Sequence, residues 1–207
     1  LAEYGTPDQK KRYLSKILAG ESVICVGMTE PEAGSAVTDL TTTATPDGDG
    51  YRINGVKVFQ THATAAEVML TYARFGPGVG GIGSVLIPRT SPGFKQGAAA
   101  NFFNGEEWVQ TYLDNVYVGP ENVLLKEGGF KKQIAGFNVE RIGNTARSLA
   151  FGRYAYNVAR EWAMTRKQFG RLLCEFQGIQ WKFADMKMKL DAGQLLIYRA
   201  AANAVNG

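Results

Sequence analysis

The stretch TPDGDGYRINGVKVFQT, Thr45–Thr61, carries the strongest structural signal in this chain. It contains the Asp-Gly pair Asp47-Gly48 and the Asn-Gly pair Asn54-Gly55. These dipeptides are the most typical central residues of tight turns between antiparallel strands, because they tolerate positive φ. We therefore expect this region to be built of β-hairpins.

Strand-like segments flank that stretch from Val23 to about Leu125. They read EVMLTYARF, IGSVLIPR and WVQTYLDNVYV, and Gly- and Pro-rich turns separate them. Strands at such spacing predict an antiparallel barrel or sandwich of about a hundred residues. The loop GPGVGGIG, Gly76–Gly83, has five glycines but lacks the Gly-Lys-Ser/Thr ending of a phosphate loop and opens no helix. We expect it to be a hairpin connection.

Helical patterns lie on both sides of the strands. Residues 6–19 predict a short helix, in which Thr6 is the N-cap and Gln9 completes a capping box. After the strands, a 3.6-residue period predicts one helix from Phe130 to about Lys167 and another from Phe176 to about Asn203. The segment QFGRLLCE between them should turn the chain so that the two helices pack antiparallel. The fold class is therefore α+β.

Composition excludes several classes of protein. With 45% hydrophobic and 20% charged residues among 207, the chain has the composition of a globular protein, and no apolar run approaches the length of a membrane span. One histidine, His62, excludes a multi-histidine metal site, and Cys25 and Cys174 have no metal spacing, so we expect no metal and reduced thiols. Because the chain starts at Leu1, we interpret it as an internal piece of a longer protein.

The net charge of +4 is unevenly distributed. Residues 1–125 hold nine Lys and Arg against thirteen Asp and Glu, whereas residues 126–207 hold fourteen against six. A basic helical half can meet nucleic acid or a phosphate-bearing small molecule. The basic residues alternate with apolar ones instead of forming runs, which favours a solvated helix face.

The loop MTEPEAGSA, Met28–Ala36, crowds acids, small residues and hydroxyls into nine positions. Gly34 can take positive φ, and Thr29 and Ser35 offer hydroxyls beside exposed backbone N–H groups. Such a loop can cradle a phosphate or a carbonyl edge. The alternative is a capped turn that leaves the β domain.

Two further stretches accompany this loop: NVERIG (residues 138–143) and TRKQFGRLLCEFQGIQ (residues 165–180). In this order and combination, the three motifs resemble the acyl-CoA dehydrogenase family, and the resemblance runs from Tyr4 to the end of the chain. It implies FAD bound between a middle β domain and a C-terminal four-helix bundle, in homodimers or homotetramers. The chain would hold the end of an N-terminal helical domain (1–21), the middle β domain (22–125) and the first two long helices of the C-terminal helical domain (126–207).

The resemblance assigns cofactor contacts to the loop. Thr29 would bond the polar edge of the flavin ring, with Met28 lining it through its backbone. Gly34 would allow close approach, and Ser35 would lie where the cofactor and the CoA thioester meet. Ala36 replaces an Asp that is common in the family and mostly structures the loop.

The strand segment KVFQTHA, Lys57–Ala63, aligns with a family segment of the form Trp-Ile-Thr-Asn-Gly. Thr61 is retained and would bond the flavin. Phe59 replaces the Trp, which keeps an aromatic face but loses the indole donor. His62 and Ala63 stand in place of Asn-Gly, and His62 is either a proton donor beside the flavin or a surface histidine.

In the segment between the long helices, Arg166 and Gln168 match positions that reach the FAD of a neighbouring subunit. Arg166 would clamp the pyrophosphate, for which a planar guanidinium is suited. Phe176 and Gln177 match further contacts to that same FAD. The alternative for Arg166 is a cation that caps the C-terminus of its helix.

The family's reaction is α,β-dehydrogenation of an acyl-CoA thioester, in which a Glu removes the Cα proton. In most members this Glu would lie beyond residue 207. In a minority it immediately precedes the Arg of the motif read here as NVERI, which makes Glu140 the candidate base. Arg141 and Asn138 match positions near the substrate, together with Ser35 of the loop.

The resemblance also implies an electron-transfer flavoprotein as electron acceptor, and a bacterial cytoplasmic or mitochondrial matrix location. Flavin-dependent monooxygenases and nitroalkane-oxidase-like enzymes resemble the same family and are the first alternative. A truncated, non-catalytic relative is the second. A nucleic-acid binder is disfavoured because the sequence contains no reader motif or basic run.

Overall fold

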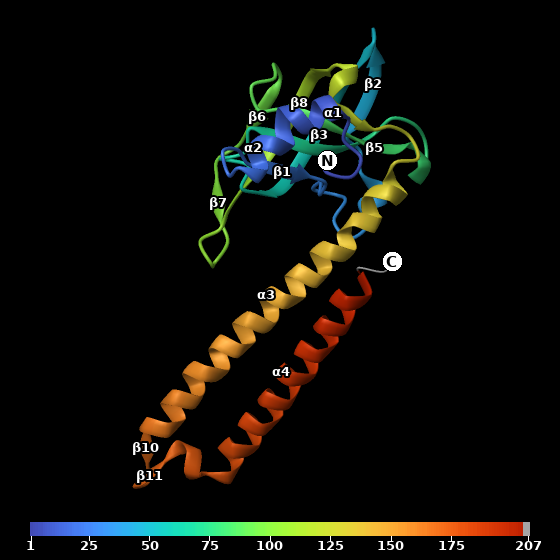
Figure 1. The fold of residues 1–207 in the computed structure, drawn as a ribbon. Helices are drawn as coiled ribbons and strands as arrows, with labels where there is room; N and C mark the ends of the chain where they lie inside the picture. Colours follow the sequence, from blue (N-terminus) through green and yellow to red (C-terminus); the bar gives the residue numbers. More distant parts are fainter. Residues whose placement is uncertain (205–207) are drawn as a thin grey trace. The chain divides into compact units, whose positions relative to one another are not determined.

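The computed structural model describes residues 1–204. The chain divides into two compact units, Leu1–Lys132 and a second that begins at Gln133. The first unit contains the large sheet, and the second contains most of two long helices (Figure 1).

A short helical segment opens the first unit. Thr6 caps it, and its side-chain oxygen accepts a hydrogen bond from Gln9 N while the Gln9 side chain accepts from Thr6 N, as the capping box predicts. The buried Gln9 amide nitrogen also donates to the backbone oxygens of Glu121 and Val123, both at 2.9 Å. These bonds tie the helix to the end of the sheet. Its parts are α1 (Pro7–Gln9), the π-helical turn η1 (Lys10–Leu14) and α2 (Ser15–Leu18).

Nine strands of the first unit form one sheet, with 3-10 turns at three of the connections. The strands are β1 (Ile24–Gly27), β2 (Thr43–Asp47), β3 (Gly50–Thr61), β4 (Val68–Arg74), β5 (Ile82–Pro88), β6 (Phe94–Gln96), β7 (Ala100–Asn101), β8 (Glu107–Val118) and β9 (Val123–Leu125). The 3-10 turns are η2 (Val37–Asp39), η3 (Val79–Gly81) and η4 (Pro120–Asn122).

The strand order is β6-β8-β3-β2-β4-β5-β9, with β1 added on β4 and β7 on β8. The predicted α+β class is confirmed. The sheet is mixed, however, because β1 runs parallel to β4 and β2 pairs in parallel with β4 at Thr43 and Arg74. Within residues 1–204 the end strands β6 and β9 are not paired with each other, so the sheet does not close into a barrel.

The two turn dipeptides of the stretch Thr45–Thr61 adopt different structures. Asp47-Gly48 lies at the β2–β3 hairpin, where Gly48 has φ 62°, as predicted. The hairpin prediction for Asn54-Gly55 was wrong, because this pair lies inside β3 at a register shift against β8. Gly55 is needed there for a close approach, since a Cβ atom would lie 2.3 Å from Thr42 Oγ1.

The glycine-rich loop is the predicted hairpin connection, between β4 and β5. These strands pair antiparallel from Val68–Pro88 to Arg74–Ile82, directly beside the loop. The unit has two clusters of buried apolar residues, of which the smaller contains Val68, Leu86 and Leu124. The larger contains Cys25, Ala44, Ile53, Ala63, Ala66, Met69, Ala73, Val85, Ile87, Val109, Leu113, Val116 and Val118.

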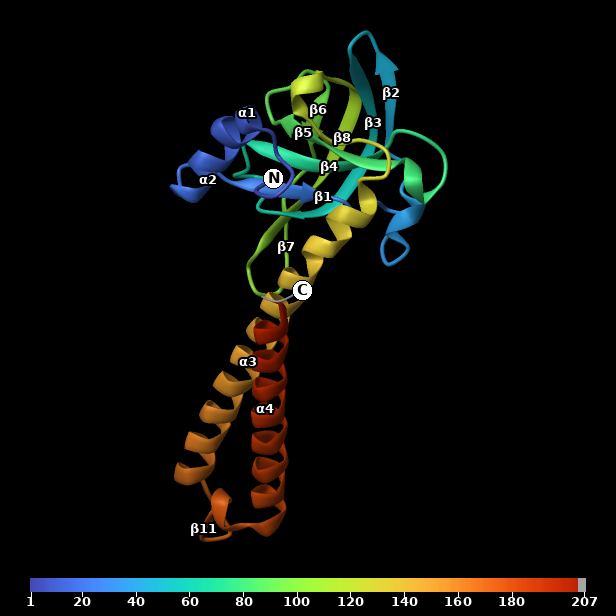
Figure 2. The same ribbon diagram turned by 45° about the vertical axis from the view of Figure 1, so that its right-hand side comes forward.

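The second unit is a helical hairpin. Helix α3 (Phe130–Thr165) begins just before the unit boundary, and α4 (Gln177–Ala204) runs back beside it in the opposite direction (Figures 1 and 2). A small hairpin of β10 (Lys167–Gln168) and β11 (Arg171–Leu172) and the turn η5 (Leu173–Glu175) join them.

Side chains along the seam confirm the antiparallel packing. The rings of Tyr156 and Phe183 meet edge-on, with centroids 5.6 Å apart. Further along, the Cβ atom of an alanine at Gly193 would lie 2.9 Å from a Leu149 methyl group. The helices thus approach closely at a small residue. Elsewhere the hairpin leaves large apolar side chains exposed, among them Phe151, Tyr154, Trp162, Trp181 and Tyr198.

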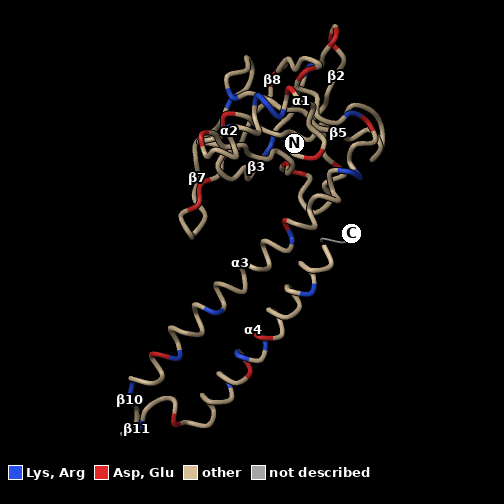
Figure 3. Tube along the Cα trace, in the orientation of Figure 1, with Lys and Arg blue, Asp and Glu red and all other residues tan. Residues whose placement is uncertain are grey.

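Figure 3 shows Lys and Arg at intervals along α3 and α4, and not in one block. This matches the alternation seen in the sequence. Of the helices within residues 1–204, none has the length and apolar character that crossing a bilayer requires.

Candidate functional site

A long loop of the first unit leaves β1 at Met28 and returns to the sheet at Thr42. The side chain of Glu30 closes this loop at its base. One carboxylate oxygen, Oε2, accepts hydrogen bonds from Thr41 N at 2.6 Å and from Thr41 Oγ1 at 2.7 Å. The other, Oε1, accepts from Thr42 N at 2.9 Å and from Thr42 Oγ1 at 2.5 Å. Glu30 thus links the start of the loop to its end.

Lys57 of β3 completes this arrangement. Its Nζ lies 2.8 Å from Glu30 Oε1, and the side chains are 0% and 3% exposed respectively. Burial alone would raise the pKa of Glu30, but the charge of Lys57 and hydrogen bonds from Lys57, Thr42 and Thr41 outweigh it and lower that pKa to about 2. Burial lowers the pKa of Lys57, and Glu30 opposes the change. We treat the pair as ionised, because Glu30 stays a carboxylate at neutral pH and favours the charged lysine.

A second cation fixes the far side of the loop. The Arg74 guanidinium donates to the backbone oxygen of Thr38 at 2.8 Å, of Leu40 at 3.1 and 3.2 Å, and of Gly78 at 2.7 Å. These carbonyl groups belong to η2, to the residue after it and to the β4–β5 loop. Both flanks of the loop are therefore held by buried or half-buried charges of the sheet.

The loop residues predicted to contact a cofactor lie between these anchors. Met28 and Thr29 are half-buried, while Gly34 and Ser35 are exposed. Gly34 does not use positive φ, and a Cβ atom there would meet no atom within 4 Å. The protein's own packing therefore does not require a glycine at this position.

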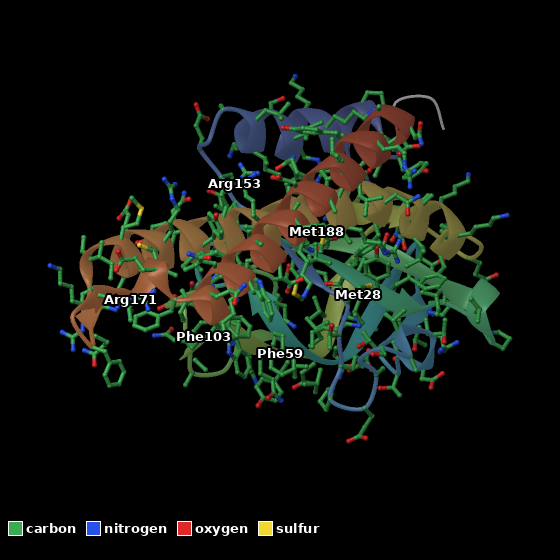
Figure 4. All side chains as sticks on the ribbon, turned by 90° about the horizontal axis from the view of Figure 1, so that it is seen from below. Met28, Phe59, Phe103, Arg153, Arg171 and Met188 are labelled. Atoms are coloured by element: carbon green, nitrogen blue, oxygen red, sulfur yellow. The ribbon has the colours of Figure 1, made fainter. Side chains whose placement is uncertain are left out.

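The loop is joined to the strand segment that carries the other predicted contacts. Val58 N donates to Thr29 O at 2.9 Å. The next residue, Phe59, has φ 61° at a bulge where the β3–β8 register shifts. Met28 and Phe59 thus come from adjoining segments of the first unit; both are labelled in Figure 4. The structure brings Met28, Thr29, Phe59 and Thr61 into one region.

Phe59 contributes an exposed aromatic face to this region. Its side chain is 52% exposed, and its ring centroid lies 4.7 Å from that of Trp108 on β8. Trp108 is also the cross-strand partner of Thr61. His62, with φ 61°, is exposed and its Nε2 lies 3.6 Å from Glu106. This placement matches the surface-histidine interpretation, and αL is a conformation that His tolerates better than most residues.

Sequence reasoning missed three residues of this region: Glu30, Lys57 and Trp108. Glu30 and Lys57 stood inside the quoted motifs, but nothing local shows that a Lys in a strand is buried. Trp108 is brought to Phe59 by strand pairing alone. Side chains of a strand alternate between its two faces, and a bulge shifts this alternation. Applying this rule to β3 is the one signal that could have placed Lys57 on the buried face.

Of the predicted substrate residues, Ser35 lies in the loop of the first unit, and Asn138 and Arg141 lie in the second unit. Arg141 Nη1 donates to Asn138 Oδ1 at 3.1 Å. Both residues line an open hollow of about 500 Å³ between the start of α3 and the end of α4; the other lining residues are Ala135, Val139, Ile142, Ala200, Asn203 and Ala204.

Glu140 is exposed and does not line this hollow. Residues two apart on an α-helix differ by about 200° in direction, so Glu140 lies on the opposite face of α3 from Asn138. Neighbouring residues differ by about 100°, so Glu140 does not point in the same direction as Arg141 either.

The four residues predicted to meet a second cofactor gather at the turn of the helical hairpin. Arg166 is exposed, and its guanidinium carbon lies 5.8 Å from the Trp162 ring centroid. Gln168 is exposed on β10, Gln177 is the first residue of α4, and Phe176 immediately precedes it. Phe169 and Gly170, with φ 52° and 76°, make the tight turn between β10 and β11.

Residues 1–204 contain no cluster of three or more His, Cys, Asp or Glu that could hold a metal ion. Cys25 is buried, and burial raises its pKa to about 11, which leaves it an unreactive thiol at neutral pH.

Comparisons of this chain with family models and with curated proteins identify the same family. Residues 25–116 match the family model for the acyl-CoA dehydrogenase middle domain, and residues 127–207 match the model for the C-terminal domain. An acyl-CoA dehydrogenase of Bacillus subtilis is 35% identical over 203 residues, covering 96% of this chain and 54% of that protein.

Solved structures give the same result. The structure of butyryl-CoA dehydrogenase from Megasphaera elsdenii has a TM-score of 0.92 at 33% identity, covering 97% of this chain and 54% of that one. A glutaryl-CoA dehydrogenase from Mycobacterium smegmatis, in complex with FADH2, has a TM-score of 0.90 at 28% identity over 99% and 53%. The chain spans about half the length of the relatives that it matches.

Proposed function

The chain belongs to the acyl-CoA dehydrogenase family, and we propose that the protein catalyses FAD-dependent α,β-dehydrogenation of an acyl-CoA thioester. One observation of this structure carries the proposal furthest. The loop with Met28 and Thr29 and the strand with Phe59 and Thr61 are joined by the bond from Val58 N to Thr29 O. The four predicted flavin contacts of these segments therefore share one region.

The chemistry of this region fits a flavin. The Thr29 and Thr61 hydroxyls can donate to the polar edge of an isoalloxazine ring, and the exposed face of Phe59 can pack against its apolar part. Within residues 1–204, no hydrogen-bond acceptor takes the Thr29 N–H. When bound, FAD would supply the acceptor for the hydride that leaves the substrate Cβ. The protein's task at this site is to hold and orient that ring.

A carboxylate must remove the Cα proton of the thioester. We propose Glu140 as the base within this chain, and the alternative is a Glu beyond residue 207. Arg141 and Asn138 would bind the substrate from the hollow at the start of α3, together with Ser35 of the loop.

The turn of the helical hairpin supports a second part of the proposal. Arg166, Gln168 and Gln177 are exposed, and Phe176 is half-buried beside them. We propose that they bind the FAD of a neighbouring subunit in a homodimer or homotetramer. A guanidinium that stacks on Trp162 keeps its donors free for a pyrophosphate. The proposed electron acceptor is an electron-transfer flavoprotein.

An anaerobic titration tests the proposal. The full-length protein is purified, and its visible flavin absorption is followed while acyl-CoAs of different chain lengths are added. Bleaching by one of them is the expected result and also names the substrate class. If the flavin is bound but none of the acyl-CoAs bleaches it, the oxygen-using relatives would be favoured. Their activity is checked by oxygen uptake with nitroalkanes. A protein without flavin would be a non-catalytic member of the family.

A further inference from the structure

We propose that the buried Glu30–Lys57 pair is a positioning device that turns the Thr29 amide toward the cofactor. The inference rests on the proposed flavin site and assigns a role to two residues that do not themselves touch the cofactor. It follows from three features: the atoms that Lys57 holds, the geometry of the peptide that follows, and the cost of burying the pair.

Lys57 holds a backbone carbonyl as well as a carboxylate. Its Nζ donates to Met28 O at 3.2 Å, besides its contact with Glu30. Because Lys57 is fully buried, the Met28 carbonyl points into the unit. Met28 itself is half-buried, so its peptide unit lies at the boundary between the buried interior and the surface.

Because the peptide bond is planar, this contact also fixes the direction of the Thr29 N–H group. In a trans peptide the C=O and the following N–H point to opposite sides, and the described chain has no cis peptide bond. With Met28 O turned inward, the Thr29 N–H points away from Lys57 and toward the outer side. Thr29 O is held separately by Val58 N. The Thr29 residue is therefore fixed on both of its peptide units while its N–H stays open.

The surroundings of Glu30 make the arrangement rigid. Its carboxylate accepts from Lys57 and from the backbone and hydroxyl groups of Thr41 and Thr42. Thr42 in turn packs against Gly55, where no side chain would fit. A shift of Lys57 would therefore disturb both ends of the loop.

Stability alone does not explain such a pair. Removing two charges from water costs as much as their attraction returns, and apolar replacements of buried ion pairs are often neutral or stabilising. The pair is close to neutral as a whole, so it also does not draw anionic ligands from a distance. Its distinctive effect is geometric: an ammonium group can hold the carbonyl of Met28, and an apolar side chain cannot.

The first test needs no substitution. Hydrogen–deuterium exchange is measured on the full-length protein, freed of flavin and then with FAD added, using peptides that isolate the Thr29 amide. We expect fast exchange without FAD and exchange at least about tenfold slower with FAD, because a new hydrogen bond would form. A Thr29 amide already protected without FAD, or unaffected by it, would overturn the inference.

The second test uses a charge-neutral double variant, Glu30→Gln with Lys57→Met, which avoids leaving one buried charge alone. Arg52→Met is the matched control, since Arg52 also lies on β3 and pairs with Asp47 but is exposed. We expect the double variant to fold, by circular dichroism, yet to bind FAD about tenfold more weakly and with shifted visible absorption bands. The control should keep the wild-type dissociation constant and spectrum.

The outcomes separate this inference from the proposed function. If the wild-type protein binds no FAD, the proposed function fails, and the exchange of Thr29 without FAD still tests the orientation of its amide. If the wild type binds FAD and the folded double variant binds it with the same affinity and spectrum, the flavin site stands and the positioning role is wrong.

Discussion

The ring of Phe59 packs against that of Trp108 with 52° between their planes, at the point where β3 bulges and Phe59 takes φ 61°. A bulky residue in the left-handed region is strained by about 1–2 kcal/mol. The ring contact with Trp108 contributes about 0.5–1.5 kcal/mol in return. The two terms nearly cancel, so the strain is tolerated while an aromatic face is held at the surface.

Substitution of Phe59 by Gly should therefore separate stability from cofactor binding. We expect Phe59→Gly to change the free energy of unfolding by less than about 1 kcal/mol, because relief of strain offsets the lost contact. FAD affinity should nevertheless fall, which titration of the flavin-free protein measures. His62→Gly is the control, since it relieves the same backbone conformation and leaves the Phe59 ring in place. An unchanged FAD affinity for Phe59→Gly would remove Phe59 from the site.

Lowering the pH should destabilise the first unit, because Glu30 becomes protonated. Its pKa is about 2 in the folded chain against an ordinary 4.5, so the unfolded chain binds the proton more readily. The stabilisation is complete above pH 4.5 and is lost as the pH falls toward 2, and it amounts to about 3 kcal/mol. Urea unfolding between pH 6 and pH 3 should show this slope in the wild type and a flatter one in Glu30→Gln/Lys57→Met. Glu32→Gln, at an exposed acid of the same loop, should keep the wild-type slope.

Close packing at Gly55 should make this residue hard to replace. A Cβ atom there would lie 2.3 Å from Thr42 Oγ1 and 2.8 Å from Thr42 Cα, and the backbone cannot move as easily as a side-chain tip. We expect Gly55→Ala to destabilise by about 2–3 kcal/mol and to weaken FAD binding through the loop. Gly48→Ala, in open space at φ 62°, should cost about 1 kcal/mol and leave FAD binding unchanged. Equal costs at the two sites would contradict the packing argument.

The base can be assigned by one substitution. If Glu140 removes the Cα proton, Glu140→Gln should lower turnover by about 10²–10⁴-fold while the flavin content stays the same. Glu161→Gln, at an exposed acid further along α3, is the matched control and should be fully active. Intact turnover in Glu140→Gln would place the base beyond residue 207.

Arg166 should link cofactor retention to assembly. We expect Arg166→Ala to lose about one to two orders of magnitude in FAD affinity, the loss typical of a charge-assisted hydrogen bond, and to weaken the oligomer together with it. Gel filtration with simultaneous detection of protein and flavin measures both. Arg147→Ala removes an exposed arginine of α3, the helix that ends just before Arg166, and should change neither. Unchanged flavin content in Arg166→Ala would leave this residue as a helix cap.

Local sequence was sufficient for the parts of this chain whose structure is locally determined. The Asp47-Gly48 turn, the capping box of Thr6 and Gln9, and the two long helices all depend on residues within a few positions of each other, and the structure confirms them. The motifs were equally readable, because a loop such as MTEPEAGSA is recognised by residue types at fixed spacing. The roles of their residues stay predictions until a ligand is measured.

Only the tertiary structure decided which polar residues are buried and what they hold. Of the two acids in the stretch MTEPEAGSA, Glu30 is buried and Glu32 is exposed, although both adjoin Pro31. Lys57 is buried because the loop after β1 folds over it, and Asn54-Gly55 became a bulge because Thr42 packs there. Burial and strand pairing join residues that are distant in sequence, and their energies depend on the partner rather than on the neighbouring residues, so no local pattern contains them.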